Sequence, residues 1–270
     1  MHVCYQNLKL IFGIVDGERA SLIRRIKKTK VTPGIKQITC REGLTWLGNG
    51  NELLVSIDKD GKQKDTVCLG EGEIKYHTFT EEGDLLFIYR NSLMRFVKRQ
   101  LRPFIMYFSD GFVATCVACS VHTGDVFTGL QNKDKQCSKV ARFSKIGKEL
   151  QVYERDSKVG VLFKSPVHLA TMKNEDICIC DSEKGVVIID ITGNHLFTYP
   201  INNPTGLTVD KGDNILVCDG SETIHVITAE GQLRRKLCVG RKGVAAVGVD
   251  MHSALLIGYQ TSSIVEVYRY

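Results

Sequence analysis

The sequence predicts an all-β chain in which a four-stranded sheet recurs about six times. The main observation is a repeat: Pro204–Asp219 with Thr223–Gly231 can be aligned with Pro166–Thr171, Asn174–Asp181 and Gly185–Gly193. Each copy reads as a strand, a tight turn, a strand ending in Asp, a short loop, a strand, a glycine turn and a strand. Self-similarity at roughly forty residues per unit is the signature of a repeat architecture.

The register of the repeat, the second observation, can be followed along most of the chain. The first apolar residue of each second strand is predicted at Leu53, Leu85, Val126, Ile177, Ile215 and Leu255, with gaps of 32, 41, 51, 38 and 40 residues. The turns before these strands contain Gly, Asp or Asn, as at Gly83, Gly124 and Gly212. These residues supply a positive φ or a side chain that bonds its own backbone. Four strands and about forty residues per unit are typical of a propeller blade.

Individual strands follow from this register. In blade four we expect Val167–Thr171, Asp176–Cys180, Val186–Ile191 and His195–Tyr199; in blade five Gly206–Asp210, Asn214–Cys218, Thr223–Thr228 and Gln232–Cys238; and in blade six Val244–Asp250, Ala254–Tyr259 and Ile264–Tyr268. A long loop, Gln131–Gln136, accounts for the wide gap after blade three. The short gap between the first two blades predicts that one of them lacks a regular strand.

The last blade has only three predicted strands, so a strand from the N-terminal part should complete it. An open ring would expose an unpaired sheet edge, which natural proteins cover or close. Lys9–Val15 and Ser21–Ile26 are the two candidates. We therefore predict one six-bladed β-propeller over residues 1–270, with residues 1–35 as ring-closing strands and lead-in. Seven blades is the alternative, if residues 1–35 form a blade of their own.

Composition, the third observation, agrees with a globular chain. Hydrophobic residues make up 43% and charged residues 24% of 270 residues, and no apolar run approaches the roughly 18 residues of a membrane span. The N-terminus lacks the basic-then-apolar layout of a signal peptide. Cys178 and Cys180 point to the same face of one strand, and Cys116 and Cys119 form a lone C-x-x-C without a second metal-binding pair. Free cysteines that fill a core are typical of a reducing compartment, so we expect a cytoplasmic protein.

The motif of the second half resembles a known repeat. Pro-Thr-Gly-Leu-Thr-Val-Asp, Gly-Asp-Asn-Ile-Leu-Val-Cys-Asp and Ile-His-Val-Ile-Thr resemble the NHL repeat over about residues 160–240, more weakly at 244–268 and least before residue 115. In the first half, Arg90-Asn91 stands where the family usually shows Asp. The resemblance implies a six-bladed propeller of the kind found at the C-terminus of tripartite-motif proteins. No RING or B-box array is present, so any ubiquitin-ligase chemistry would lie outside this chain.

The polar residues of the repeat have two interpretations. Asp181 and Asp219 could be metal ligands or acids near the axis, but their identical positions favour carboxylates that cap the loop after each strand. Histidines such as His122, His168 and His225 are scattered over presumed strands, which is typical of structural residues. No nucleophile elbow, phosphate loop or oxygen-ligand cluster is evident. The sequence therefore predicts no enzyme, cofactor, metal or small-molecule substrate.

Charge indicates a binding surface instead. The formal charge is +6, and basic residues are predicted in loops of one propeller face: Lys59, Lys62, Lys64, Arg90, Lys133, Lys135, Arg241 and Lys242. We expect a non-catalytic scaffold that binds a protein partner through this face, as the substrate-recognition part of a ubiquitin ligase would. One alternative is an RNA-binding propeller that uses the basic face. A second alternative is a hydrolase similar to the six-bladed lactonases, which coordinate calcium around the axis.

Overall fold

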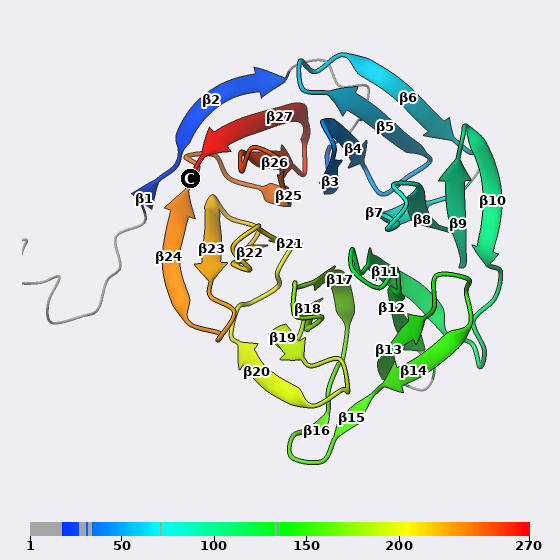
Figure 1. Cartoon of the computed structure of the whole chain (residues 1–270). Helices are drawn as coiled ribbons and strands as arrows, with labels where there is room; N and C mark the ends of the chain where they lie inside the picture. Colours follow the sequence, from blue (N-terminus) through cyan, green and yellow to red (C-terminus); the bar gives the residue numbers. More distant parts are fainter. Residues whose placement is uncertain (1–17, 27–30, 32–33, 71, 133, 135) are drawn as a thin grey trace, which may run out of the picture.

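The structure, a computed structural model, describes the chain except for residues 1–17, 27–30, 32–33, 71, 133 and 135. Six blades, each with four antiparallel strands, stand in a ring around one axis, and the described part contains no helix (Figure 1). It accordingly holds no helix long and apolar enough to cross a membrane. The predicted six-bladed β-propeller is confirmed.

Each blade contains four strands, the first nearest the axis and the last on the outside of the ring. Blade one contains β3 (Gln37–Arg41), β4 (Leu44–Gly48), β5 (Leu53–Asp58) and β6 (Gln63–Cys68), and blade two β7 (Ile74–Phe79), β8 (Leu85–Tyr89), β9 (Ser92–Val97) and β10 (Gln100–Ile105). Blade three contains β11 (Val113–Cys119), β12 (Val126–Asn132), β13 (Cys137–Phe143) and β14 (Glu149–Tyr153), and blade four β17 (Pro166–Thr171), β18 (Ile177–Asp181), β19 (Gly185–Ile189) and β20 (His195–Tyr199). Blade five contains β21 (Gly206–Val209), β22 (Ile215–Cys218), β23 (Thr223–Ile227) and β24 (Leu233–Cys238), and blade six β25 (Val244–Val249), β26 (Leu255–Tyr259), β27 (Ser262–Arg269) and β2 (Ser21–Ile26).

An N-terminal strand closes the ring, as predicted. β2 lies antiparallel along β27 as the outermost strand of blade six, with Arg25 opposite Glu266 (Figure 1). The short strand β1 (Glu18–Arg19) pairs in parallel with β24 of blade five. Of the two candidate segments, Ser21–Ile26 forms the closure, and Lys9–Val15 lies outside the described residues.

The hydrophobic core formed by the described residues falls into six clusters, each between two neighbouring blades. Inner strands therefore have both faces covered, and all five residues of β18 are buried. Burial on both faces explains why the second strands read as nearly continuous apolar runs. The outermost strands keep one face in water, so β20 alternates and exposes Leu196.

The prediction of an incomplete blade at the start of the ring is wrong. Leu53 begins the third strand of blade one, and the second strand is β4, which contains the buried Trp46. The turn over residues 48–52 joins the second and third strands but has the Gly/Asn composition expected between the first and second strands. The sequence-based prediction therefore assigned the Leu53 strand to the second position instead of the third. The wide gap after blade three has a second cause besides its loop, the inserted hairpin β15 (Arg155–Asp156) and β16 (Gly160–Val161).

Candidate functional site

The two faces of the propeller carry different loops. The connection face, as we call it, carries the loops between second and third strands and the connections between blades. The hairpin face carries the loops between first and second and between third and fourth strands. Arg90, Arg241 and Lys242 lie on the connection face, where the sequence predicted them.

Three other residues of the predicted basic surface, Lys59, Lys62 and Lys64, do not lie on the connection face. Lys59 and Lys62 lie in the turn between the third and fourth strands of blade one, on the hairpin face, where Lys59 is close to Asp250 and His252. The prediction that these two lysines share the connection face with Arg90 and Arg241 is wrong. The strand that begins at Leu53 is the third of its blade, so the loop after it lies on the hairpin face. Lys64 has entered β6 and pairs with Asp58 at 2.9 Å.

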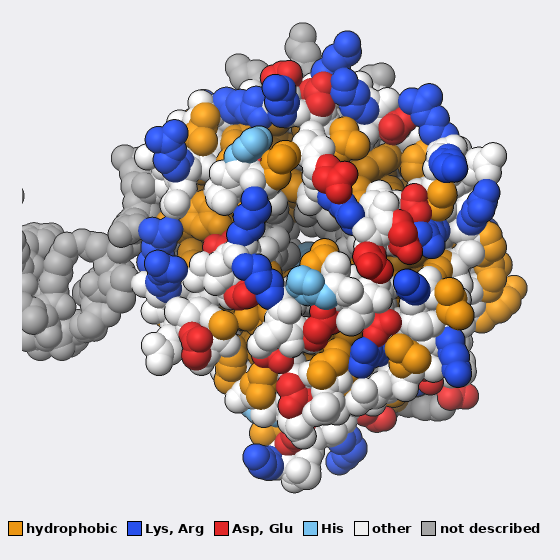
Figure 2. All heavy atoms as spheres, in the orientation of Figure 1, with side chains coloured by type: hydrophobic (Ala, Val, Ile, Leu, Met, Phe, Trp, Pro, Cys, Tyr) orange, Lys and Arg blue, Asp and Glu red, His pale blue; other side chains and the backbone are white. Residues whose placement is uncertain are grey.

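Charges of both signs are mixed on the surface. Lys133 and Lys135 lie outside the described residues. Figure 2 shows one face of the ring, where Lys and Arg side chains alternate with Asp and Glu around a central opening. Around the opening, no large area of this surface carries charges of a single sign.

The two predicted arginines stack on aromatic rings. The Arg90 guanidinium lies 5.3 Å from the centre of the Tyr89 ring, and that of Arg241 lies 4.4 Å from the centre of the Tyr259 ring. Sequence reasoning found no aromatic residue beside the basic loops, because it could not place Tyr259 of blade six next to the preceding connection. These contacts hold the guanidinium planes against the protein.

Asp181 has a structural role. Its side chain is fully buried, and Oδ2 accepts hydrogen bonds from the backbone N–H groups of Lys164 and Ser165 at 2.7 and 2.8 Å. Oδ1 accepts two more from the backbone of Glu183 and Lys184, at 3.0 and 3.1 Å. The carboxylate thus joins the loop after β18 to the segment before β17, and it does not reach the axis.

Asp219 performs a related task in blade five. Its Oδ1 accepts hydrogen bonds from the backbone and hydroxyl of Ser221, at 2.9 and 2.6 Å. Its Oδ2 lies 3.6 Å from Nε2 of His225. The preference for a loop-capping role over a metal ligand therefore agrees with the geometry at both Asp residues.

The predicted turn glycines are in first turns on the hairpin face. Gly83 and Gly124 have φ values of 90° and 71°, in the left-handed region that favours glycine. In the equivalent turn of blade five the left-handed residue is Asp213, with φ of 57°, and Gly212 donates its N–H to Asp210.

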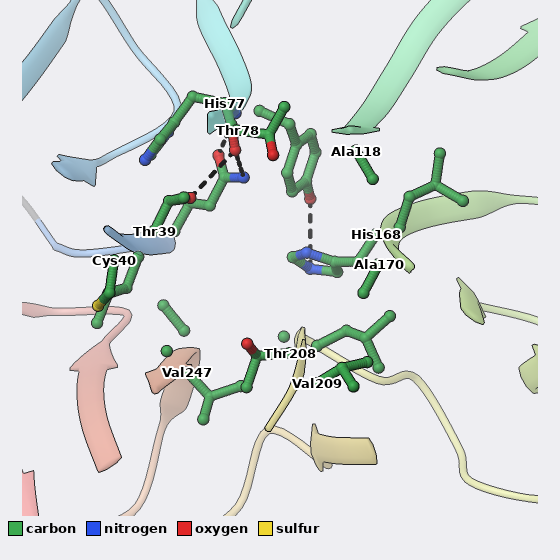
Figure 3. Close-up of a pocket in the computed structure, with 18 of the residues that line it drawn as sticks. Thr39, Cys40, His77, Thr78, Ala118, His168, Ala170, Thr208, Val209 and Val247 are labelled. Carbon is green, nitrogen blue, oxygen red and sulfur yellow. Dashed lines mark hydrogen bonds between the residues drawn. The ribbon is translucent and has the colours of Figure 1, made fainter. Parts of the chain in front are cut away.

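The innermost strands enclose a cavity on the axis (Figure 3). Its volume is about 240 Å³, and all six blades contribute to its wall. A second cavity of about 600 Å³ opens towards the connection face, where Ser182, Asn203 and Gln260 form part of its rim. Three residues, Lys36, Tyr76 and His168, line both cavities and so mark the place where they meet.

Tyr76 and His168 lie against each other in this wall. The Tyr76 hydroxyl lies 3.5 Å from Nε2 of His168, and the two rings meet edge to face with centres 4.7 Å apart (Figure 3). Ring closure brings them together from β7 and β17, which are 92 residues apart in sequence. Sequence reasoning assigned His168 to a strand as a structural histidine and had no signal for its partner.

Burial shifts the pKa values of both His168 and Tyr76. Burial lowers the pKa of His168 to about 4, although a hydrogen bond with the Thr205 backbone acts in the opposite direction. The imidazole is therefore neutral at physiological pH and can accept a proton. Burial raises the pKa of the Tyr76 phenol well above its ordinary value, so this hydroxyl stays protonated.

The wall does not fit calcium. This ion takes about six to eight oxygen ligands, mostly carboxylates, but none of the described residues lining the two cavities is Asp or Glu. The Gln37 amide is occupied by the backbone of His77, through bonds of 2.7 and 2.8 Å. Within the described ranges no three His, Cys, Asp or Glu side chains gather in a way that could hold a metal ion.

Comparison with known proteins supports the fold. No family model matches the sequence, and no curated protein matches it. The solved structure of a gluconolactonase from Xanthomonas campestris is 12% identical, with a TM-score of 0.72, and the match covers 94% of this chain and 96% of that one. A streptogramin B lyase structure is 12% identical with a TM-score of 0.65, over 91% of this chain and 97% of that one. The WD40 propeller domain of Doa1 is 14% identical with a TM-score of 0.61, over 93% and 96%.

These comparisons contradict the prediction of a non-catalytic scaffold. Two of the three similar structures bear the names of enzymes, a gluconolactonase and a lyase, which favours the second alternative, a hydrolase, over the scaffold. At these identities the likeness shows the fold, and the reaction has to be argued from the residues of this chain. None of the three is described as an NHL protein, so the NHL resemblance stays a prediction. The chain has a six-bladed β-propeller fold, to which the structures of this gluconolactonase and this lyase are similar.

Proposed function

We propose that the protein is a hydrolase that cleaves esters, cyclic esters included, of small molecules bound in the axial cavities. The observation that carries this proposal is the Tyr76–His168 pair at the junction of the two cavities. In this pair the neutral imidazole of His168 can act as a general base, and the neighbouring phenol of Tyr76 can donate a proton. The likeness to a gluconolactonase structure is consistent with it at the level of the fold.

The pair can carry the proton transfers of ester hydrolysis. Nε2 of His168 takes a proton from a water molecule, whose oxygen attacks the ester carbonyl carbon. When the acyl–oxygen bond breaks, the leaving alkoxide takes the Tyr76 proton, and the imidazolium returns its proton to the phenolate. One water is consumed, and an acid and an alcohol are released. A phenol of raised pKa suits this step because it gives its proton only to a strong base such as an alkoxide. The long Tyr76–His168 distance is usual before substrate binds.

His168→Gln should lower kcat/KM for ester hydrolysis by roughly 100-fold or more, the contribution typical of a general base. Tyr76→Phe should lower kcat most for esters with poor leaving groups, because these need the donated proton. The assay follows 4-nitrophenyl butyrate and δ-valerolactone, with His122→Gln as the control, since His122 is exposed on a hairpin-face loop. Equal rates for wild type and folded His168→Gln protein would reject the proposal.

Isotope labelling separates hydrolysis from elimination. In ¹⁸O-labelled water the label should enter the acid product, because the attacking oxygen comes from solvent. An unsaturated product without label would identify an elimination and overturn the hydrolytic reaction.

The pH dependence should follow the pKa of His168. We expect kcat/KM to be flat from about pH 8 down to about pH 5, and to fall about tenfold per pH unit below the pKa of about 4. The rates are to be measured within seconds of a pH jump, before the protein unfolds in acid. A decline centred near the ordinary histidine value would contradict this assignment.

A further inference from the structure

We infer that the substrate carries a carboxylate, which Lys36 binds at the junction of the axial cavities while the ester lies at Tyr76 and His168. The second half of this statement rests on the proposed function. The first half, an anion site at Lys36, stands on the charge and geometry of the cavity walls alone.

The two cavities are lined by described residues of which one is charged. Among the described residues that line either cavity, Lys36 is the one with a formal charge at neutral pH. The lining residues of the outer cavity are otherwise neutral: Tyr76, Val167, His168, Ser182, Asn203, Pro204, Thr205, Ala245, Gln260 and Thr261. No described carboxylate forms a salt bridge with the Lys36 amine. A single cation in an otherwise neutral cavity attracts an anionic ligand.

The backbone at Lys36 is held firmly by hydrogen bonds to the neighbouring blades. The Ile35 N–H donates to the Tyr259 carbonyl at 2.9 Å, and that of Lys36 donates to the Gly48 carbonyl at 2.8 Å. A Cβ at Gly34 would stand 1.9 Å from the Gln260 carbonyl oxygen, so only glycine permits this close approach. The segment is fixed between blades six and one, and its exposed residue Lys36 lines both cavities, with the amine close to Gly50.

The groups around the outer cavity suit a carboxylate better than a phosphate. A phosphoryl group is usually held by arginine forks or by several backbone N–H groups. The outer cavity is lined by one amine, that of Lys36, and by the hydroxyls and amides of Ser182, Thr205, Asn203, Gln260 and Thr261. One flexible amine with neutral hydrogen-bonding neighbours suits a monoanion.

A matched set of esters tests the inference. 4-Nitrophenyl butyrate is neutral, whereas the mono-4-nitrophenyl esters of succinate, adipate and suberate place a carboxylate at increasing distance from the same reacting ester. We expect kcat/KM of the best hemiester to exceed that of the butyrate about tenfold, the effect of about 1.4 kcal/mol of extra binding. Lys36→Met should raise KM for that hemiester about tenfold, with kcat within about twofold, and leave the neutral ester unchanged. Lys148→Met, an exposed lysine of a hairpin-face turn, is the control.

Binding without turnover separates the inference from the proposed function. Adipate itself should raise the melting temperature of the wild type and of His168→Gln, but not of Lys36→Met. Adipate binding that needs Lys36, in a protein without esterase activity, would refute the hydrolase and keep the anion site. Esterase activity without preference for hemiesters, and without effect of Lys36→Met, would overturn the inference and leave the hydrolase standing.

Discussion

Glu266→Ala is expected to lower the free energy of unfolding by about 1–3 kcal/mol, the usual cost of leaving a buried hydrogen-bond donor without its acceptor. Glu266 lies on β27 with its side chain 2% exposed, and Oε1 accepts a hydrogen bond from Arg25 Nε at 2.6 Å. The hydroxyls of Tyr259 and Tyr268 donate to its other oxygen. Burial acts to raise the pKa of Glu266, but the bonds from the two tyrosines and Arg25 keep it below its ordinary value.

The loss is large because this network joins the closing strand to the ring. Arg25 is on β2, opposite Glu266 in the strand register, so the ion pair spans the seam where the two ends of the chain meet. Alanine would leave the Tyr259 hydroxyl buried without its acceptor, at a cost of about 1–3 kcal/mol, and would remove the charge that holds Arg25. A loosened β2 would also expose the edge of β27 to other chains.

Urea unfolding measures this effect. Glu266→Gln keeps the shape and an acceptor for the tyrosines but removes the charge, so its loss should be smaller than that of alanine. Glu149→Ala, at the exposed start of β14, should stay within about 0.5 kcal/mol of the wild type. The role of the network in ring closure is refuted by a Glu266→Ala protein that is as stable as this control.

Acid should unfold the protein in a window set by two buried histidines. Burial lowers the pKa of both His77 and His168 to about 4 from 6.5, and His77 leaves Nδ1 without a hydrogen-bond partner among the described residues. A group whose pKa is lower in the folded state contributes full stability above its unfolded pKa. This stability is lost as the pH falls from about 6.5 to about 4, at most about 3 kcal/mol for each histidine.

Thermal or urea unfolding at several pH values tests this. His77→Gln should roughly halve the loss of stability between about pH 6.5 and 4, because the substituted side chain takes up no proton there while His168 still does. His122→Gln, which changes an exposed histidine, should leave the curve as it is in the wild type. If His77→Gln and wild type lose stability in parallel over this window, the assignment to His77 fails.

The propeller fold was predictable because its turns and loop-capping residues recur within short sequence segments. The candidate site was not, because it depends on contacts between strands that are distant in the sequence. Asp181 and the equivalent Asp219 recur because each caps the same loop, so they revealed the register of blades four and five. Blade one misled the sequence-based prediction because its second turn has the composition of a first turn. Tyr76 and His168 meet only when blades two and four are brought around the axis, and no local pattern contains that information.

Ester binding in the axial cavities is tested most directly by a crystal structure of folded His168→Gln protein with bound mono-4-nitrophenyl adipate. We expect uncleaved ester in the axial cavity, with its leaving-group oxygen about 3 Å from the Tyr76 hydroxyl, within hydrogen-bond reach, and its carboxylate at Lys36. Ester bound on the hairpin face or the outer rim, with the axial cavity empty at a saturating concentration, would contradict it.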